Sequence, residues 1–175
     1  MHFRTFQKTG VEVLSLGGQQ WESNAWPPEH WKSNKGRWRL FTPGIDEYLN
    51  ETLKSMHFGE SVLNFVLLLE VADFQSWGEG LAFTGPEGFC RYKHKTKELW
   101  SVGRIDWTSV QDCTAREQLQ AYVGAFMFAV ETAALAKRKP KDFDMQGFSA
   151  VVIERLRAAK VSQLSRSTYA ARGEA

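Results

Sequence analysis

The apolar segment over residues 62–71 restricts the fold of this chain more than any other part of the sequence. Its odd-numbered positions are all apolar, so one complete face of a strand has to be buried. The opposite face is less regular, which predicts a central strand with one half-covered side. A strand of this kind needs other strands beside it and helices packed on it. The residues of the buried face are Leu63, Phe65, Leu67, Leu69 and Val71.

Three helices are predicted around this strand. The first begins at Thr42 and Pro43, which suit a helix start, and ends near Gly59. The second begins with the capping box Thr114 to Glu117 and continues through a stretch that is almost free of polar residues until about residue 136. The third is amphipathic and spans about residues 144–160.

The remaining segments predict strands and one long loop. Residues 2–8 and 11–16 are expected to form a hairpin, as are residues 89–95 and 98–106. Residues 17–31 predict a loop, and residues 35–41 a short strand. Because strands and helices do not alternate regularly, we expect an α+β fold with a mainly antiparallel sheet and helices packed on one face. A single domain over residues 1–160 is expected, with a C-terminal tail over residues 161–175 that frays.

Size and composition indicate a folded domain but no function. The 175 residues match one domain, and 43% hydrophobic with 24% charged residues exclude disorder of the whole chain. Cys90 and Cys113 match no zinc or redox spacing and predict two reduced thiols. No signal peptide is recognised, and no apolar segment approaches the roughly 18 residues of a membrane span. We therefore expect a cytoplasmic protein without membrane contact.

The usual signatures of catalysis and of cofactor binding do not occur. The glycine-containing segments at residues 17–18, 78–80 and 85–88 lack the helix that phosphate binding needs. Cys90 and His94 lie about 13 Å apart on the predicted strand, too far to form a nucleophile and base pair. No spacing of His, Asp or Glu indicates a metal site. We predict a protein that is not an enzyme and has no cofactor, with a small enzyme of unrecognised site as an alternative.

Two features of the sequence, one basic and one aromatic, are also compatible with an alternative function as a nucleic-acid-binding or carbohydrate-binding module. Basic residues on the predicted sheet surface (Arg91, Lys93 and Lys95) with nearby aromatics could bind a single-stranded nucleic acid, although the acidic middle of the chain would repel phosphate. Tryptophans concentrate in the predicted loop, where they could cover the core, bind a sugar or form a protein contact. These tryptophans are Trp21, Trp26 and Trp31.

Charge is distributed unevenly along the chain. The net charge is +2, yet residues 41–80 contain seven acids and a single base, Lys54. Such a segment can attract a basic partner. The seven acids are Asp46, Glu47, Glu51, Glu60, Glu70, Asp73 and Glu79.

Residues 36–135 resemble small immunity proteins of bacterial polymorphic-toxin and contact-dependent inhibition systems. The resemblance rests on residues 58–61, on the pattern of apolar residues and acids over residues 63–74, and on the later Tyr92-Lys93, Leu99-Trp100 and Ile105-Asp106-Trp107. It implies a cytosolic protein that is not an enzyme and that neutralises a cognate toxin domain, often by blocking its active site. A toxin that acts on an anionic substrate, such as a nuclease, would present a basic active site to this partner.

The acidic segment supplies the predicted contacts with that toxin. Glu51 lies beyond the first helical turn and has no capping role, whereas Asp46 and Glu47 are also explained as partners of the helix dipole. Asp73 and Glu79 follow the central strand, where recognition residues are often found. The predicted toxin contacts are therefore Glu51, Asp73 and Glu79 with Trp77 as an aromatic anchor, and the secondary ones are Asp46, Glu47, Glu60, Glu70, Trp21, Trp26 and Trp31.

Overall fold

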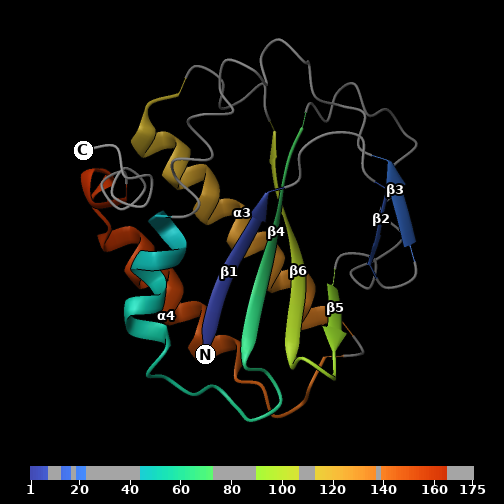
Figure 1. Cartoon of the computed structure of the whole chain (residues 1–175). Helices are drawn as coiled ribbons and strands as arrows, with labels where there is room; N and C mark the ends of the chain where they lie inside the picture. The colour runs from blue at the N-terminus through green and yellow to red at the C-terminus, as the bar shows by residue number, and fades with distance from the viewer. Residues whose placement is uncertain are drawn as a thin grey trace, which may run out of the picture.

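A four-stranded mixed sheet lies at the centre of the fold (Figure 1). The computed structural model describes residues 1–7, 13–16, 19–22, 44–72, 90–106, 113–136 and 139–164. The strand order is β1-β4-β6-β5, with β1 and β6 both parallel to β4, and β5 antiparallel to β6. The α+β class agrees with this arrangement, but the expected mainly antiparallel sheet is wrong. The bounds are β1 His2–Gln7, β4 Asn64–Ala72, β5 Cys90–Lys93 and β6 Glu98–Asp106.

The predicted N-terminal hairpin does not form. β1 pairs with β4, while β2 (Val13–Leu16) pairs with β3 (Gln19–Glu22) in a separate two-stranded sheet. β3 also lies inside the segment that was expected to be a loop. The physical reason is that β1 pairs with β4 along one edge while the side chains of Asp46 and Asn50 bond backbone groups of its other edge, so no edge of β1 is left for a hairpin partner. The strand predicted over residues 35–41 lies outside the described residues.

β4 is buried as predicted at three of its five positions, is exposed at one, and the side chain of the fifth, Val71, lies outside the described part of the structure. The side chains of Phe65, Leu67 and Leu69 are fully buried in the core. Leu63 is 45% exposed because the strand begins only at Asn64, so its predicted burial is wrong. Val66 and other residues of the opposite face are buried as well, which makes β4 a strand that is covered on both sides.

The second predicted hairpin is confirmed. β5 and β6 pair antiparallel, with Cys90 opposite Ser101 and Lys93 opposite Glu98. The turn over residues 94–97 contains Lys97 with a φ of 51°. In β6, Leu99 and the other odd-numbered residues face the helices.

The predicted helices form with shorter bounds. Residues 44–53 are helical, so the first helix ends before Gly59. Its predicted start at Thr42 and Pro43 lies outside the described part of the chain. α3 (Ala115–Leu135) begins with the expected capping box, and α4 (Met145–Ala158) is capped by the Asp144 carboxylate. Residues 161–164 form one more helical turn with a fully buried Leu164, so residues placed in the fraying tail belong to the core.

α3 packs closely against β6 at one small residue. A Cβ atom at Gly103 would lie 2.7 Å from the carbonyl oxygen of Ala125, so only glycine allows this approach of helix and strand. Next to it, the buried Ser101 hydroxyl donates to the Ala129 carbonyl oxygen at 2.7 Å. Phe148 of α4 packs against Phe65 on the same face of the sheet, with the two ring centroids 4.8 Å apart. Both helices therefore cover one face of the sheet (Figure 1).

Truncation of β4 should test this core. We expect Leu67→Ala to lower the free energy of unfolding by about 2–5 kcal/mol, because the substitution loses buried apolar surface and leaves a cavity. Leu63→Ala serves as the matched control, since Leu63 is 45% exposed, and should cost less than about 1 kcal/mol. Urea denaturation measures both values, and equal losses for the two variants would contradict the assigned strand.

Candidate binding groove between α3 and α4

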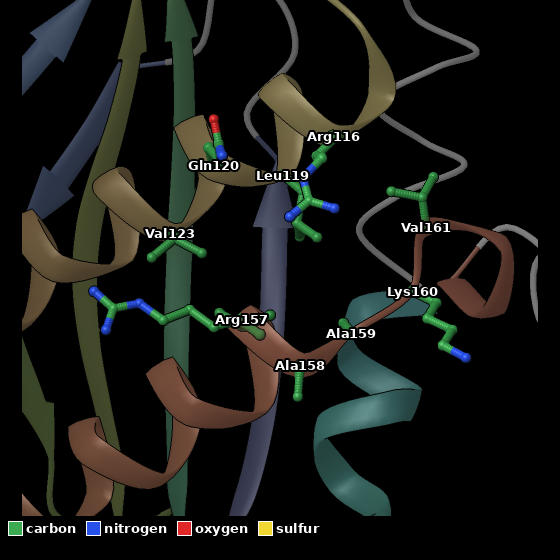
Figure 2. Close-up of a pocket in the computed structure, with 10 residues that line it drawn as sticks. Arg116, Leu119, Gln120, Val123, Arg157, Ala158, Ala159, Lys160 and Val161 are labelled. Carbon is green, nitrogen blue, oxygen red and sulfur yellow. The ribbon is translucent and has the colours of Figure 1, made fainter.

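A groove of about 700 Å³ lies between the N-terminal half of α3 and the C-terminal end of α4 (Figure 2). This volume lies in the range of binding pockets for small ligands and peptide side chains. Its floor is apolar, and its rim carries basic side chains. The lining residues are Arg116, Leu119, Gln120, Val123, Leu156, Arg157, Ala158, Ala159, Lys160 and Val161.

The α3 wall follows from helical spacing. Arg116, Gln120 and Val123 recur at intervals of three and four residues, so their side chains follow one side of the helix. Leu119 lies beside them and is turned into the core. Arg116 is in the first helical turn, where the helix dipole disfavours a cation. Its position therefore does not serve the stability of α3.

The α4 wall forms where the helix ends. Leu156 is fully buried and holds the last turn against the core, while Arg157 is exposed. The chain leaves the helix at Ala159, whose backbone is extended with a ψ of 133°. Lys160 therefore lies outside α4, just beyond its C-terminal end, and its side chain points away from α3 (Figure 2).

The three cations of the groove have no counterion in the described structure. Arg116, Arg157 and Lys160 are all exposed, and no carboxylate among the described residues forms an ion pair with them. Arg155, on another side of α4, differs because its guanidinium lies 3.9 Å from the Glu51 carboxylate. The groove thus keeps a positive charge that the described residues do not neutralise.

The nearest acids in the sequence do not change this charge balance. The Glu117 carboxylate accepts hydrogen bonds from the Thr114 backbone amide at 2.7 Å and from its hydroxyl at 2.8 Å. These bonds lower the pKa of Glu117 and keep its carboxylate at the helix cap. Glu154, one turn before Arg157, is exposed and makes no ion pair with it.

This arrangement suits an anionic group attached to an apolar body. Guanidinium groups bind carboxylates and phosphates through two parallel hydrogen bonds. Leu119, Val123 and Leu156 offer an apolar floor below them. The groove can therefore bind a partner that combines acids with apolar side chains.

Asp46 has a structural role at the edge of β1. Its carboxylate accepts from the Thr5 backbone amide at 2.7 Å and from the Thr5 hydroxyl at 2.6 Å. Asn50, one helical turn later, accepts from the Phe3 amide at 2.8 Å and donates to the Phe3 carbonyl oxygen at 2.7 Å. Two helix side chains thus satisfy the outer edge of β1, which explains why Asp46 faces the sheet.

The same contact continues into the core. The Thr5 hydroxyl lies 2.7 Å from the hydroxyl of Tyr122, which is buried in α3. Burial raises the pKa of Asp46 to about 6, although the hydrogen bonds from Thr5 oppose this shift. Burial, followed by the charge of Asp46, also raises the pKa of Tyr122. Asp46, Thr5 and Tyr122 therefore form a partly buried polar network that links three elements.

The other described acids of the predicted toxin surface remain exposed but are not gathered into one site. Glu47 and Glu51 lie four residues apart on the helix over residues 44–53, and Glu51 pairs with Arg155. Glu60 lies in the connection before β4, where its backbone amide donates to Asp142 at 3.1 Å.

The remaining predicted contacts are only partly described. Glu70 is part of β4 and Trp21 of β3, but their side chains lie outside the described part of the structure. The other predicted contacts, namely Asp73, Trp77, Glu79, Trp26 and Trp31, lie outside the described residues entirely.

The described residues offer no clear catalytic centre. Burial raises the pKa of the Cys90 thiol to about 12, so its thiolate does not form near neutral pH. His94 lies in the turn between β5 and β6 and packs edge-on against Tyr92, with ring centroids 4.4 Å apart. A smaller cavity of about 340 Å³ beside it includes Lys139 and Asp142. Within the described ranges, no three His, Cys, Asp or Glu residues gather as metal ligands would.

The sequence analysis predicted only an amphipathic helix in the segment that contains Arg157 and Lys160. It missed the groove because the convergence of two helix ends is a tertiary feature. One signal was present in the sequence, namely the unfavourable arginine in the first turn after the Thr114 cap.

No known protein family matches this chain, and neither the curated proteins nor the solved structures gave a match. Among the described helices, none combines the length and the apolar character that crossing a membrane requires.

The raised pKa of Asp46 predicts a specific dependence of stability on pH. An unfolded aspartate titrates near pH 4, whereas Asp46 in the fold titrates at about 6. Its stabilising effect is therefore complete below about pH 4 and is lost as the pH rises through about 6. Relative to Asp46→Asn, the wild type should lose at most about 3 kcal/mol of unfolding free energy between about pH 4 and pH 7.

Asp142→Asn is the control with the opposite sign. Hydrogen bonds, with those from Ser61 the largest cause, lower the pKa of Asp142, so its stabilisation is present above its unfolded pKa and is lost on acidification. Chemical denaturation at several pH values measures both differences. A wild type that gains stability over Asp46→Asn as the pH rises would contradict the burial of this carboxyl group.

Proposed function

We propose that this protein is an immunity protein that neutralises a cognate toxin domain by binding it, and that the α3–α4 groove is part of the binding surface. The protein class comes from the sequence resemblance described above. The observation that carries the choice of surface is the set of three cations, Arg116, Arg157 and Lys160, around an apolar floor without a counterion among the described residues.

The position of the groove supports a binding role. Both walls belong to helices that are fixed to the sheet by buried side chains, among them Tyr122 in α3 and Phe148 in α4. A surface on such elements changes little on binding, so less ordering entropy is lost when the partner binds. Unpaired cations at the rim would also accelerate association with an acidic partner.

The basic groove predicts a partner surface of the opposite charge to the one expected from the acidic segment. The acidic segment predicted contact with a basic active site, but Asp46 is turned inward and Glu51 pairs with Arg155. The groove instead requires carboxylates on the toxin. In this proposal the toxin contacts the groove through an acidic surface, while the exposed Glu47 remains as a contact for basic residues elsewhere.

The proposal predicts that a toxin domain is encoded next to this gene, and a growth assay with that domain tests it. Co-expression of the wild-type protein should restore growth of cells that produce the toxin domain. The double variant Arg116→Glu/Arg157→Glu should lose this protection, because reversed charges repel the acidic contact surface. Purified proteins should show a loss of affinity of about tenfold or more, as expected for charged pairs in an interface.

Lys54→Glu is the matched control, since Lys54 is an exposed base that does not line the groove. This variant should protect as the wild type does, and circular dichroism confirms that all variants are folded. Failure of the wild type to protect would contradict the immunity function. Full protection by the double variant would leave that function intact but exclude the groove.

A further inference from the structure

The apolar surface of the groove continues along α3. Gln120 and Val123 line the groove, and Gly124 and Met127 follow them at helical spacing. Met127 is 38% exposed, and Gly124 is exposed as well. A sparsely polar strip therefore leads from the cations at the start of α3 to the middle of the helix.

Gly124 has no explanation within the described structure. A Cβ atom at Gly103 would lie 2.7 Å from a backbone oxygen, and one at Gly59 or Gly147 would lie closer still to its nearest atom. A Cβ atom at Gly124 meets nothing within 4 Å. Glycine in a helix interior lowers helix stability, so this residue disfavours the free protein. Close approach of another chain would explain it.

We propose that an acidic amphipathic helix of the partner protein lies along α3, with its carboxylates at Arg116, Arg157 and Lys160 and its apolar face on Val123, Gly124 and Met127. This inference rests on the proposed function, because it takes the groove as the binding surface. Helices recognise apolar grooves through anchors spaced three and four residues apart, which matches the spacing of this strip.

Charge complementarity selects this occupant over the others. The last eleven residues of the chain contain two arginines and one glutamate, so their charge does not complement the groove. A small anionic ligand would use the groove but not the exposed Met127 beyond it. Glu131, one further turn along the helix, is exposed and sets the polarity of the partner helix. The acids of that helix have to lie away from Glu131, over the cations of the groove.

A designed peptide provides the probe. It is a synthetic helix of about four turns, or roughly 15 residues, with leucine and alanine on one face and glutamates at one end. A second peptide carries glutamine in place of every glutamate. Fluorescence anisotropy should show binding of the acidic peptide to the wild-type protein, with an affinity at least about tenfold higher than that of the glutamine peptide.

Two variants test the cationic part and the apolar part of this surface separately. Arg157→Glu should weaken binding of the acidic peptide by about tenfold or more. Gly124→Gln should weaken it by a similar factor, while thermal unfolding of the free protein stays unchanged or shifts upward, because glutamine favours the helix and its side chain enters open space. Ala150→Gln on the exposed side of α4 is the matched control and should bind normally.

The outcomes separate this inference from the proposed function. Loss of both peptide binding and growth protection in Gly124→Gln, without loss of stability, supports the helix along α3. Normal binding and protection by Gly124→Gln overturn it, even where Arg157→Glu abolishes protection and thus supports the groove. Absence of binding by the acidic peptide overturns it also. Tighter binding of a single-stranded oligonucleotide, with the same dependence on Arg157, overturns it in favour of a nucleic acid.

Discussion

The outer edge of β1 is the constraint on which the rest of the structure depends. An edge strand presents free amide and carbonyl groups, and here the side chains of Asp46 and Asn50 occupy those of Phe3 and Thr5. Asp46 and Asn50 are about one helical turn apart, and this distance is close to the distance between Phe3 and Thr5, which are two residues apart in the strand. The helix over residues 44–53 thereby closes the sheet without adding a strand. Thr5 then extends the contact to Tyr122, so that β1, this helix and α3 share one polar network.

The groove depends on the same framework. Tyr122 positions α3 from one side, while the small residues of β6 let the helix approach the sheet at Gly103. Phe148 brings α4 against the aromatic core. Since both helices are fixed through their buried faces, their polar ends meet in a constant geometry. The basic rim of the groove is therefore a consequence of how the two helices are held, and its side chains contribute little to holding them.

Patterns among neighbouring residues predicted the helices and strands better than the sequence predicted which of these elements contact one another. The Thr114 capping box, the amphipathic pattern from about residue 144 and the alternation in β4 depend on neighbouring residues, and each element formed close to its predicted position. The pairing of β1 with β4 could not be predicted, because it depends on a free strand edge in β4, which lies about 60 residues away in the sequence. For the same reason the contact of Asp46 with Thr5 could not be predicted, because a first-turn acid fits a helix dipole equally well whether it faces solvent or a strand. The groove required knowledge of both helix ends in space.

The parallel pairing of β1 also affects how the chain folds as it is made. His2 lies opposite Asn64, so β1 has to wait for a strand that begins about 60 residues later in the sequence. At ribosomal speeds of about 5–20 residues per second, this delay is roughly 3–12 s. During that time the strand is a free edge, able to pair with other nascent chains. The charged or polar His2 and Arg4 alternate with Phe3 in this strand, and such residues discourage premature association. The polar residues of β1 thus protect the chain before its partner strand exists.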